Sequence, residues 1–146
     1  MPTTTTPRPA ASAHAATVAA AEGLIDRRDV RAVLSHLAED VTWDVVDEPW
    51  TPHAAGVPWL LPRRGHADVA EFLAIAGAWS YERFEVLDLM VSETRVAAAV
   101  RLVADLPNGG RLDEVVIHLW AFGEDGSVAS LRRMLDTAAH IAAARA

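Results

Sequence analysis

One histidine stands out as a residue that could do chemistry. His118 lies in the apolar run Arg111–Phe122, where alternation places it on one face of a β-strand with Val116, Trp120 and Phe122. A histidine among large apolar neighbours either moves protons near neutral pH or is a core residue satisfied by one hydrogen bond. The residue pattern alone leaves both interpretations open.

Arginines on the neighbouring strands could supply positive charge to the same site. Pairing two strands through the turn 107–110 places Arg101 opposite Val116 and therefore on the face of the histidine. An inward arginine in an apolar pocket needs an anion or a carboxylate as its partner. A register shifted by one residue would instead put Arg101 on the surface. Only one of Arg132 and Arg133, on the last strand, can face inward.

The first predicted strand adds a wall residue and an acid. Trp43, Val45 and Asp47 share a face of this strand, and Trp43 is a candidate wall residue. Asp47 is either a base whose pKa is raised by burial or a solvated acid in a turn. The residues that follow, 47–64, contain four prolines together with Trp50 and Trp59, and we expect this irregular segment to close over a binding site as a lid.

Composition excludes several classes of function. The chain has 146 residues, a formal net charge of −7 and no cysteine. This charge argues against binding to nucleic acid or to anionic membranes, and the missing cysteines exclude disulfides and thiolate catalysis. The six histidines lack the spacing of a metal site, so we expect neither a metal nor a cofactor. No run is long enough to span a membrane, and no signal peptide is recognised, so we expect a cytoplasmic protein.

The order of the predicted elements indicates an α+β fold with helices first and a curved antiparallel sheet later. The expected helices cover residues 12–26, 30–37, 65–76 and 136–146, and the expected strands cover 41–46, 81–91, 95–106, 111–122 and 127–136. Residues 1–11 are expected to form a disordered tail. Residues 12–140 then form a single domain, and residues 141–146 a C-terminal tail.

Three stretches carry a resemblance to a known superfamily. They are GLIDRRDVRAVLSHLAEDVTW at 23–43, RRGHADVAEFL at 63–73 and DGSVASLRRMLDT at 125–137. In this order the chain resembles the nuclear transport factor 2-like (NTF2-like, cystatin-like α+β) superfamily, which includes ketosteroid isomerase and the SnoaL-like polyketide cyclases, over nearly all of residues 16–140. The resemblance implies a cone-shaped sheet wrapped around the N-terminal helices, with a cavity that usually receives a small apolar molecule.

Matching to the isomerase keeps one functional position and loses two. Its general-base aspartate falls at Val45 and its oxyanion-hole tyrosine at Ala21, and neither side chain can do that chemistry. Its oxyanion-hole aspartic acid falls at His118, which the resemblance therefore directs into the cavity. The cyclase's catalytic aspartate corresponds to Asp136 only if the last strand carries a bulge.

The resemblance implies a cofactor-independent acid/base enzyme acting on a small apolar carbonyl or polyketide-like compound, as a cyclase, an isomerase or a dehydratase-type lyase. The alternative is a non-catalytic domain of the same fold that binds a small molecule or serves as a scaffold. Epoxide hydrolysis is less favoured, because Ala99, Arg101 and Arg133 stand where the limonene-epoxide-hydrolase group needs its Arg-Asp pair and its last-strand aspartate.

The residues singled out above form a predicted site, and the apolar positions of the sheet predict an assembly. We expect His118, Asp47 and Arg101 to be catalytic. The expected substrate-binding residues are Trp43, Val45, Trp50, Trp59, Val116, Trp120, Arg133 and Leu135. The expected outer face of the sheet, with Ile117, Leu119 and Ala121 beside Ala98, Val100 and Leu102, is too apolar to stay in water, so we expect a homodimer packed sheet to sheet.

Overall fold

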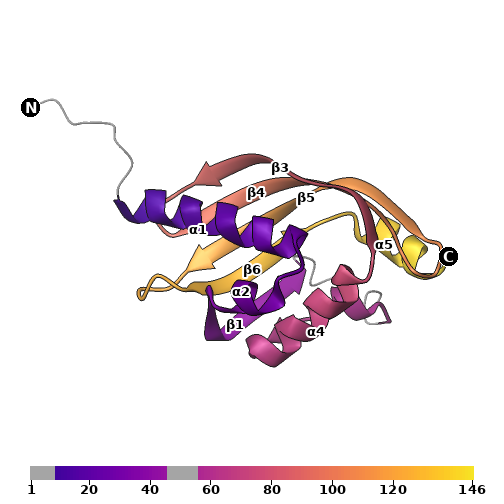
Figure 1. The fold of residues 1–146 in the computed structure, drawn as a ribbon, viewed down its shortest axis with the longest axis horizontal. Coiled ribbons are helices and arrows are strands. Elements are labelled where there is room, and N and C mark those ends of the chain that lie inside the picture. Colours follow the sequence, from indigo (N-terminus) through magenta and orange to yellow (C-terminus); the bar gives the residue numbers. More distant parts are fainter. Residues whose placement is uncertain (1–8, 46–55) are drawn as a thin grey trace, which may run out of the picture.

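A curved six-stranded sheet with helices on its concave side forms the body of the protein (Figure 1). The computed structural model describes residues 9–45 and 56–146. The elements are α1 (Pro9–Asp26), α2 (Val30–Leu34), β1 (Leu37–Val45), the 3-10 turn η2 (Pro58–Leu60), β2 (Arg63–Arg64), α4 (Gly65–Gly77), β3 (Ser80–Val91), β4 (Arg95–Asp105), β5 (Arg111–Phe122), β6 (Val128–Met134) and α5 (Thr137–Ala144). The predicted α+β class is confirmed.

Local sequence signals account for the helix boundaries. The side chain of Asp29 accepts a hydrogen bond from the backbone of Ala32 at 3.2 Å, which caps the start of α2 as expected. Asp136 caps α5 in the same way, through the backbone N–H of Ala139. Asp136 is thus an exposed helix cap. Helix α2 ends at Leu34, three residues earlier than expected, because the chain enters β1 at Leu37.

The sheet is mixed, whereas a purely antiparallel sheet was expected. Its strand order is β2-β1-β6-β5-β4-β3, and β1 pairs with β6 in parallel while the other neighbours are antiparallel. The earlier start of β1 follows from this pairing, since Leu37 already lies opposite Val128. The first and last strands of the chain therefore lie side by side in the middle of the sheet (Figure 1).

The register of β4 and β5 differs by one residue from the predicted register. Ala98 lies opposite His118 and Arg101 lies opposite Val115, because the connecting turn occupies the five residues between Asp105 and Arg111. A shift of one residue exchanges the two faces of a strand. The inward orientation expected for Arg101 is therefore wrong. Ala98, Val100 and Leu102, which were expected on the outer face, are buried inside.

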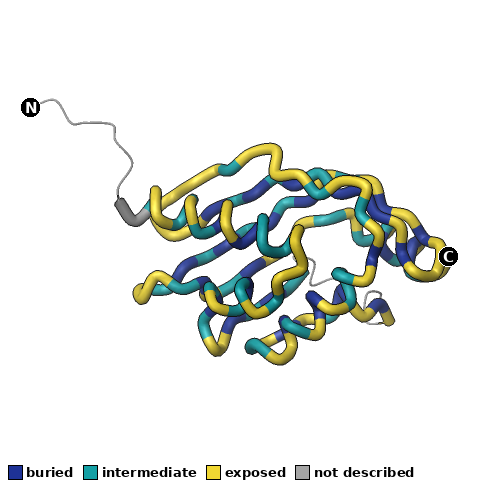
Figure 2. Tube along the Cα trace, in the orientation of Figure 1, coloured by how far each residue is buried: buried dark blue, intermediate teal, exposed yellow. Residues whose placement is uncertain are grey.

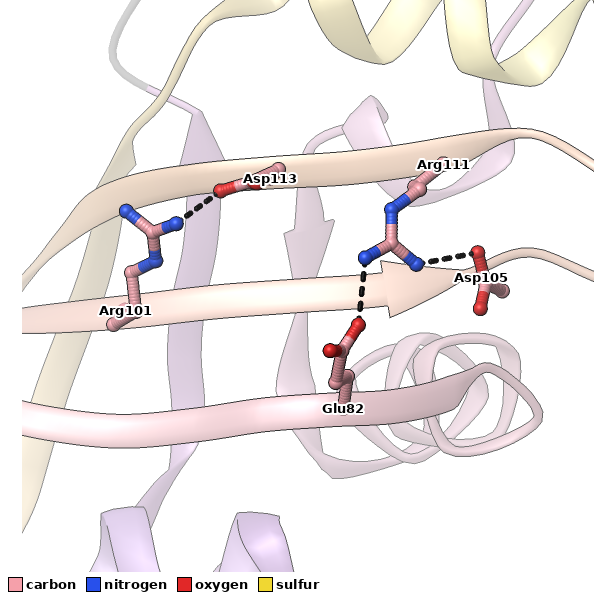
Figure 3. A network of polar contacts seen from close by, with 5 residues as sticks. All are labelled: Glu82, Arg101, Asp105, Arg111 and Asp113. Carbon is pink, nitrogen blue, oxygen red and sulfur yellow. Dashed lines mark hydrogen bonds and ion pairs between the residues drawn. The ribbon is translucent and has the colours of Figure 1, made fainter.

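Arg101 belongs instead to a polar network on the outer face (Figure 3). Its guanidinium forms an ion pair with Asp113 on β5. Next to this pair, Arg111 contacts Glu82 at 2.6 Å and Asp105 at 2.9 Å, and these hydrogen bonds raise the pKa of Arg111 above its ordinary value. The network ties β3, β4 and β5 together across solvent-exposed surface.

The core lies between the concave face of the sheet and the helices, where alternate strand residues are buried (Figure 2). Val116, Trp120 and Phe122 are buried with His118, which confirms the predicted face of β5. No helix among the described residues is long and apolar enough to cross a membrane.

Residues 141–144, which were assigned to the expected C-terminal tail, belong to the terminal helix that was also expected. Helix α5 continues to Ala144, and Ala143 is buried. The side chain of Asn108, in the β4–β5 turn, donates hydrogen bonds to the backbone oxygens of Ala143 and Ala144 at 3.0 and 3.1 Å. At the other end, α1 begins at Pro9, inside the segment expected to be a disordered tail, and residues 1–8 lie outside the described part.

The contact between α5 and the β4–β5 turn can be tested at one glycine. A Cβ atom on Gly110 would lie 2.2 Å from the backbone oxygen of Ala143, so Gly110→Ala must push α5 away. We expect a loss of about 1–3 kcal/mol in the free energy of unfolding, measured by urea denaturation. Gly23→Ala is the matched control, because its Cβ meets only a flexible arginine 3.6 Å away and should stabilise α1 by about 0.5–1 kcal/mol. Equal effects of the two substitutions would contradict this account.

Candidate active site

A cavity lies between the concave face of the sheet and the helices. The centre of a water molecule can reach about 70 Å³ of it. Its wall is mostly apolar, and exposed residues of the α1–α2 turn mark the mouth. The lining residues are Leu24, Ile25, Asp26, Arg28, Asp29, Val30, Val33, Trp43, Phe72, Leu73, Ala76, Gly77, Trp79, Tyr81, Phe84, Leu102, Val116, His118, Leu131, Arg133, Leu135 and His140. A concave apolar site with a few polar groups is typical of small-molecule binding.

His118 is held in the cavity wall by a buried carboxylate from α1. Its Nδ1 lies 2.6 Å from Oε1 of Glu22, and the indole Nε1 of Trp120 donates to the same oxygen at 3.1 Å. Glu22 is only 1% exposed. Because an indole N–H can only donate, Oε1 acts as an acceptor, and Nδ1 of His118 donates the second hydrogen bond. The Nε2 atom of His118 then carries the lone pair and has no protein partner among the described residues.

Arg133 lies directly opposite His118 on the neighbouring strand β6. Its side chain is 5% exposed, with the guanidinium carbon 4.3 Å from the centre of the Phe72 ring. One terminal nitrogen donates to the backbone oxygen of Trp59, and the buried Nε has no partner. Burial, with a smaller contribution from Arg63, lowers the pKa of Arg133 to about 9, so the group still carries its charge at neutral pH. A base and a cation thus share one wall.

A second histidine chain closes another part of the cavity. The indole N–H of Trp59 donates to Nδ1 of His140 at 2.9 Å, so Nδ1 carries no proton. Nε2 of His140 then carries the proton and donates a hydrogen bond to Oε1 of Glu114, at 2.5 Å. This chain joins η2, α5 and β5. Both nitrogens of His140 are occupied, whereas His118 keeps one nitrogen available.

Tyr81 adds a neutral polar group to the wall. Its hydroxyl donates to the backbone oxygen of Ala76 at 2.9 Å. Burial raises the pKa of Tyr81 above its ordinary value, so the hydroxyl stays protonated at neutral pH. Tyr81 therefore offers no negative charge to the arginine nearby.

The structure brings part of the predicted site together. Trp43, Val116, His118, Arg133 and Leu135 line the cavity, and of the two neighbouring arginines it is Arg133 that points inward. Trp120 lies behind the wall, where it positions the carboxylate of Glu22. Val45 is half-buried against the core and does not line the cavity.

The segment predicted to be a lid is packed where it is described. Val57, Trp59 and Leu60 are buried, and Trp59 supports His140 from behind. Asp47 and Trp50 lie outside the described residues, so their predicted roles and the lid itself stay predictions.

Three functional candidates were missed by the sequence argument, although each left a signal. Glu22 follows Val18 by four residues and precedes Ile25 by three, which is the spacing of one buried helix face. Glu114 shares the parity of His118 along β5, which indicates the inner face. His140 belongs to the predicted terminal helix, but no local pattern indicates what it contacts.

No three side chains of His, Asp or Glu converge to hold a metal ion within the described ranges. The polar groups deep in the cavity are His118 and His140, each with a carboxylate partner, together with the buried Arg133 and the hydroxyl of Tyr81. Their chemistry is that of proton transfer and anion stabilisation.

The sequence matches the SnoaL-like domain family over residues 18–131. This chain belongs to that family. The structure agrees, since it superposes on an NTF2-like protein of unknown function from Burkholderia pseudomallei K96243 with a TM-score of 0.77 at 22% identity, covering 92% of this chain and 98% of the other. The SnoaL-like chain therefore has the expected NTF2-like fold. No curated protein matches the sequence.

Two further structures share the fold of this SnoaL-like protein. TerC, co-crystallised with polyporic acid, has a TM-score of 0.76 at 18% identity, with 92% of this chain and 99% of TerC covered. SalBIII, an epoxide hydrolase/cyclase-like enzyme with a role in pyran ring formation in the polyether salinomycin, has a TM-score of 0.65 at 19% identity, with 83% and 88% covered.

The hydrogen bonds predict opposite tautomers for the two buried histidines. At neutral pH His118 should carry its proton on Nδ1 and His140 on Nε2, because their partners are an acceptor and a donor respectively. Long-range proton–nitrogen NMR correlations distinguish these forms, and His118→Gln and His140→Gln variants assign the signals. Two signals of the same tautomer would contradict the hydrogen-bond pattern described here.

Proposed function

We propose that this SnoaL-like protein is a cofactor-independent enzyme that moves a proton on a small, largely apolar carbonyl or polyketide-like compound. The reaction is of the cyclase, isomerase or dehydratase type. The observation that carries the proposal is the Glu22–His118 pair, at 2.6 Å, in the wall of an apolar cavity. A carboxylate that holds a histidine by Nδ1 leaves Nε2 oriented to accept a proton, which is the arrangement of a general base.

The proton transfer can be written on the groups present. Nε2 of His118 takes a proton from a carbon next to a carbonyl, and the electron pair of the broken C–H bond moves onto the carbonyl oxygen. The carboxylate of Glu22 stabilises the resulting imidazolium, while Arg133, opposite His118, stabilises the enolate oxygen. The imidazolium then returns the proton to another carbon in an isomerisation. In a cyclisation the enolate carbon attacks a second carbonyl, whose oxygen takes the proton.

Arg133 thereby takes the electrostatic role first expected of Arg101, which the register places on the other face. SalBIII, of the same fold, has a role in pyran ring formation, which agrees with cyclase-type chemistry. Epoxide hydrolysis remains the less favoured activity, because the positions of the known Arg-Asp arrangement hold other residues.

The alternative is a non-catalytic domain that holds a small molecule. A histidine sealed behind packed side chains would favour it. Instead, His118 lines the cavity and has a buried carboxylate partner, which favours the enzyme. Burial of an acid for binding alone would be a costly way to orient one ring.

The proposal can be tested without knowing the natural substrate. 2-Tetralone is an apolar ketone with an acidic C–H, and its exchange with D2O can be followed by proton NMR. The protein should accelerate this exchange, and His118→Gln should lose about 10²- to 10⁴-fold of the acceleration, because glutamine cannot accept the proton near neutral pH. His66→Gln, outside the cavity lining, should retain it. Binding of the ketone with no accelerated exchange would instead favour the alternative.

We also propose that the protein forms a homodimer through the outer face of the sheet. Ile117 lies between Ala99 and Met134 on this face, with Val115 and Met90 nearby, each of these two 49% exposed. The polar network borders this apolar area, because Arg101 lies opposite Val115 across β4 and β5. The outer face of the sheet therefore remains the proposed dimer surface. From β4 it contains the odd-numbered residues, not the even-numbered ones that were expected.

Sedimentation at micromolar concentration tests the dimer. The molecular mass obtained from sedimentation should be twice the chain mass of 15.7 kDa. Ile117→Glu should shift it to the monomer by placing unpaired charges in the interface, because its neighbours Ala99 and Met134 are apolar. Val91→Glu, on the opposite face at 44% exposure, should leave the dimer intact. A wild-type protein found only as a monomer would exclude this assembly.

A further inference from the structure

Arg133 is a buried cation whose charge no nearby carboxylate balances in the described part of the chain. A guanidinium has five N–H donors, and the hydrogen bonds of the described residues account for one, to the backbone oxygen of Trp59. The Nε atom is buried without a partner. The arginine–carboxylate pairs of the described residues lie elsewhere, at Arg63, Arg101 and Arg111.

The charged groups that the structure describes around Arg133 do not balance its charge. Arg63, itself buried, has a like charge and lowers the pKa of Arg133. Asp44 acts in the opposite sense but lies beyond ion-pair distance, beside Arg132 on the outer face. Tyr81 is neutral. Contact with the Phe72 ring stabilises the charge of Arg133 only in part, because the face of an aromatic ring interacts with a cation more weakly than the water that burial removes.

Buried charges in proteins are normally paired. A cation that lines an otherwise apolar cavity is therefore balanced when the cavity holds an anion. A guanidinium fits a carboxylate best, because its planar fork can donate two parallel hydrogen bonds to the two oxygens. The apolar wall, which includes Trp43, Phe72 and Leu102, suits the ring or chain that carries this group.

We propose that the cavity selects a ligand with a carboxylate on an apolar ring and that Arg133 is the residue that binds the carboxylate. This deepens the proposed function, and rests on it only for the identity of the ligand as a substrate. Since His118 and Arg133 are direct neighbours across the two strands, a carboxylate on Arg133 places adjacent carbons of the ligand beside Nε2 of His118. The carboxylate takes two of the remaining N–H groups of Arg133 and leaves a third for the enolate oxygen of the proposed reaction, so that the ligand's own charge, rather than shape alone, positions the reacting carbon.

The test compares two probes of the same shape. Benzoate is ionised at pH 7 and benzamide is neutral, and isothermal titration calorimetry measures the affinity of each. The wild-type protein should bind benzoate at least about tenfold more tightly than benzamide. Arg133→Gln should bind the two probes equally. Arg132→Gln is the matched control, since this neighbouring arginine is exposed, and it should retain the preference.

Other variants separate this inference from the acid/base proposal. His118→Gln should lose deuterium exchange but keep the preference for benzoate. Arg133→Lys keeps the charge and should keep a reduced preference, which covers the case that Arg133→Gln does not fold. Equal affinity of the wild-type protein for both probes would overturn the inference, as would an unchanged preference in Arg133→Gln. A carboxylate elsewhere in the chain that neutralised Arg133 would give the first of these results.

Discussion

The arrangement of the cavity depends on one buried carboxylate. Oε1 of Glu22 receives N–H groups from His118 and Trp120, which are two residues apart on β5 and therefore on the same face. Because two donors on β5 bind one side chain of α1, they fix both the position of this helix along its axis and its rotation about that axis. A buried acid is tolerated only with such partners. The contact that orients the histidine is thus also the contact that seats the first helix.

The hydrogen-bonded chain through His140 fixes the C-terminal helix α5, just as the contacts of Glu22 fix the first helix α1. Trp59, His140 and Glu114 come from η2, α5 and β5, and no two of them belong to the same element. Both chains use β5 as their base, and both end on a carboxylate with one oxygen unpartnered, in Glu22 and Glu114. The central strand therefore carries the polar groups, while helices from the two ends of the chain bring their partners.

Patterns within single stretches of sequence predicted the features that depend on neighbouring residues alone. Alternation along β5 gave the correct face for His118, and turn chemistry separated the strands. The predicted register of β4 and β5 was wrong because the connecting turn has five residues and was counted as four. The difference of one residue places Arg101 on the outer face. The partners of the site are non-local: Glu22 is 96 residues from His118 in sequence, and Trp59 is 81 residues from His140. No periodicity encodes such distances, so these contacts need the structure.

The place of β1 in the sheet has a consequence for synthesis. Because β1 pairs on one side with β2 and on the other with β6, the gap between β1 and β5 is filled by β6, which is synthesised after the other five strands of the sheet. Until then a nascent chain exposes two strand edges, which are sites for pairing with other chains. Helix α5, with His140, follows later still. The cavity therefore forms only after both β6 and α5, which supply Leu131, Arg133 and His140 to its wall, have been synthesised.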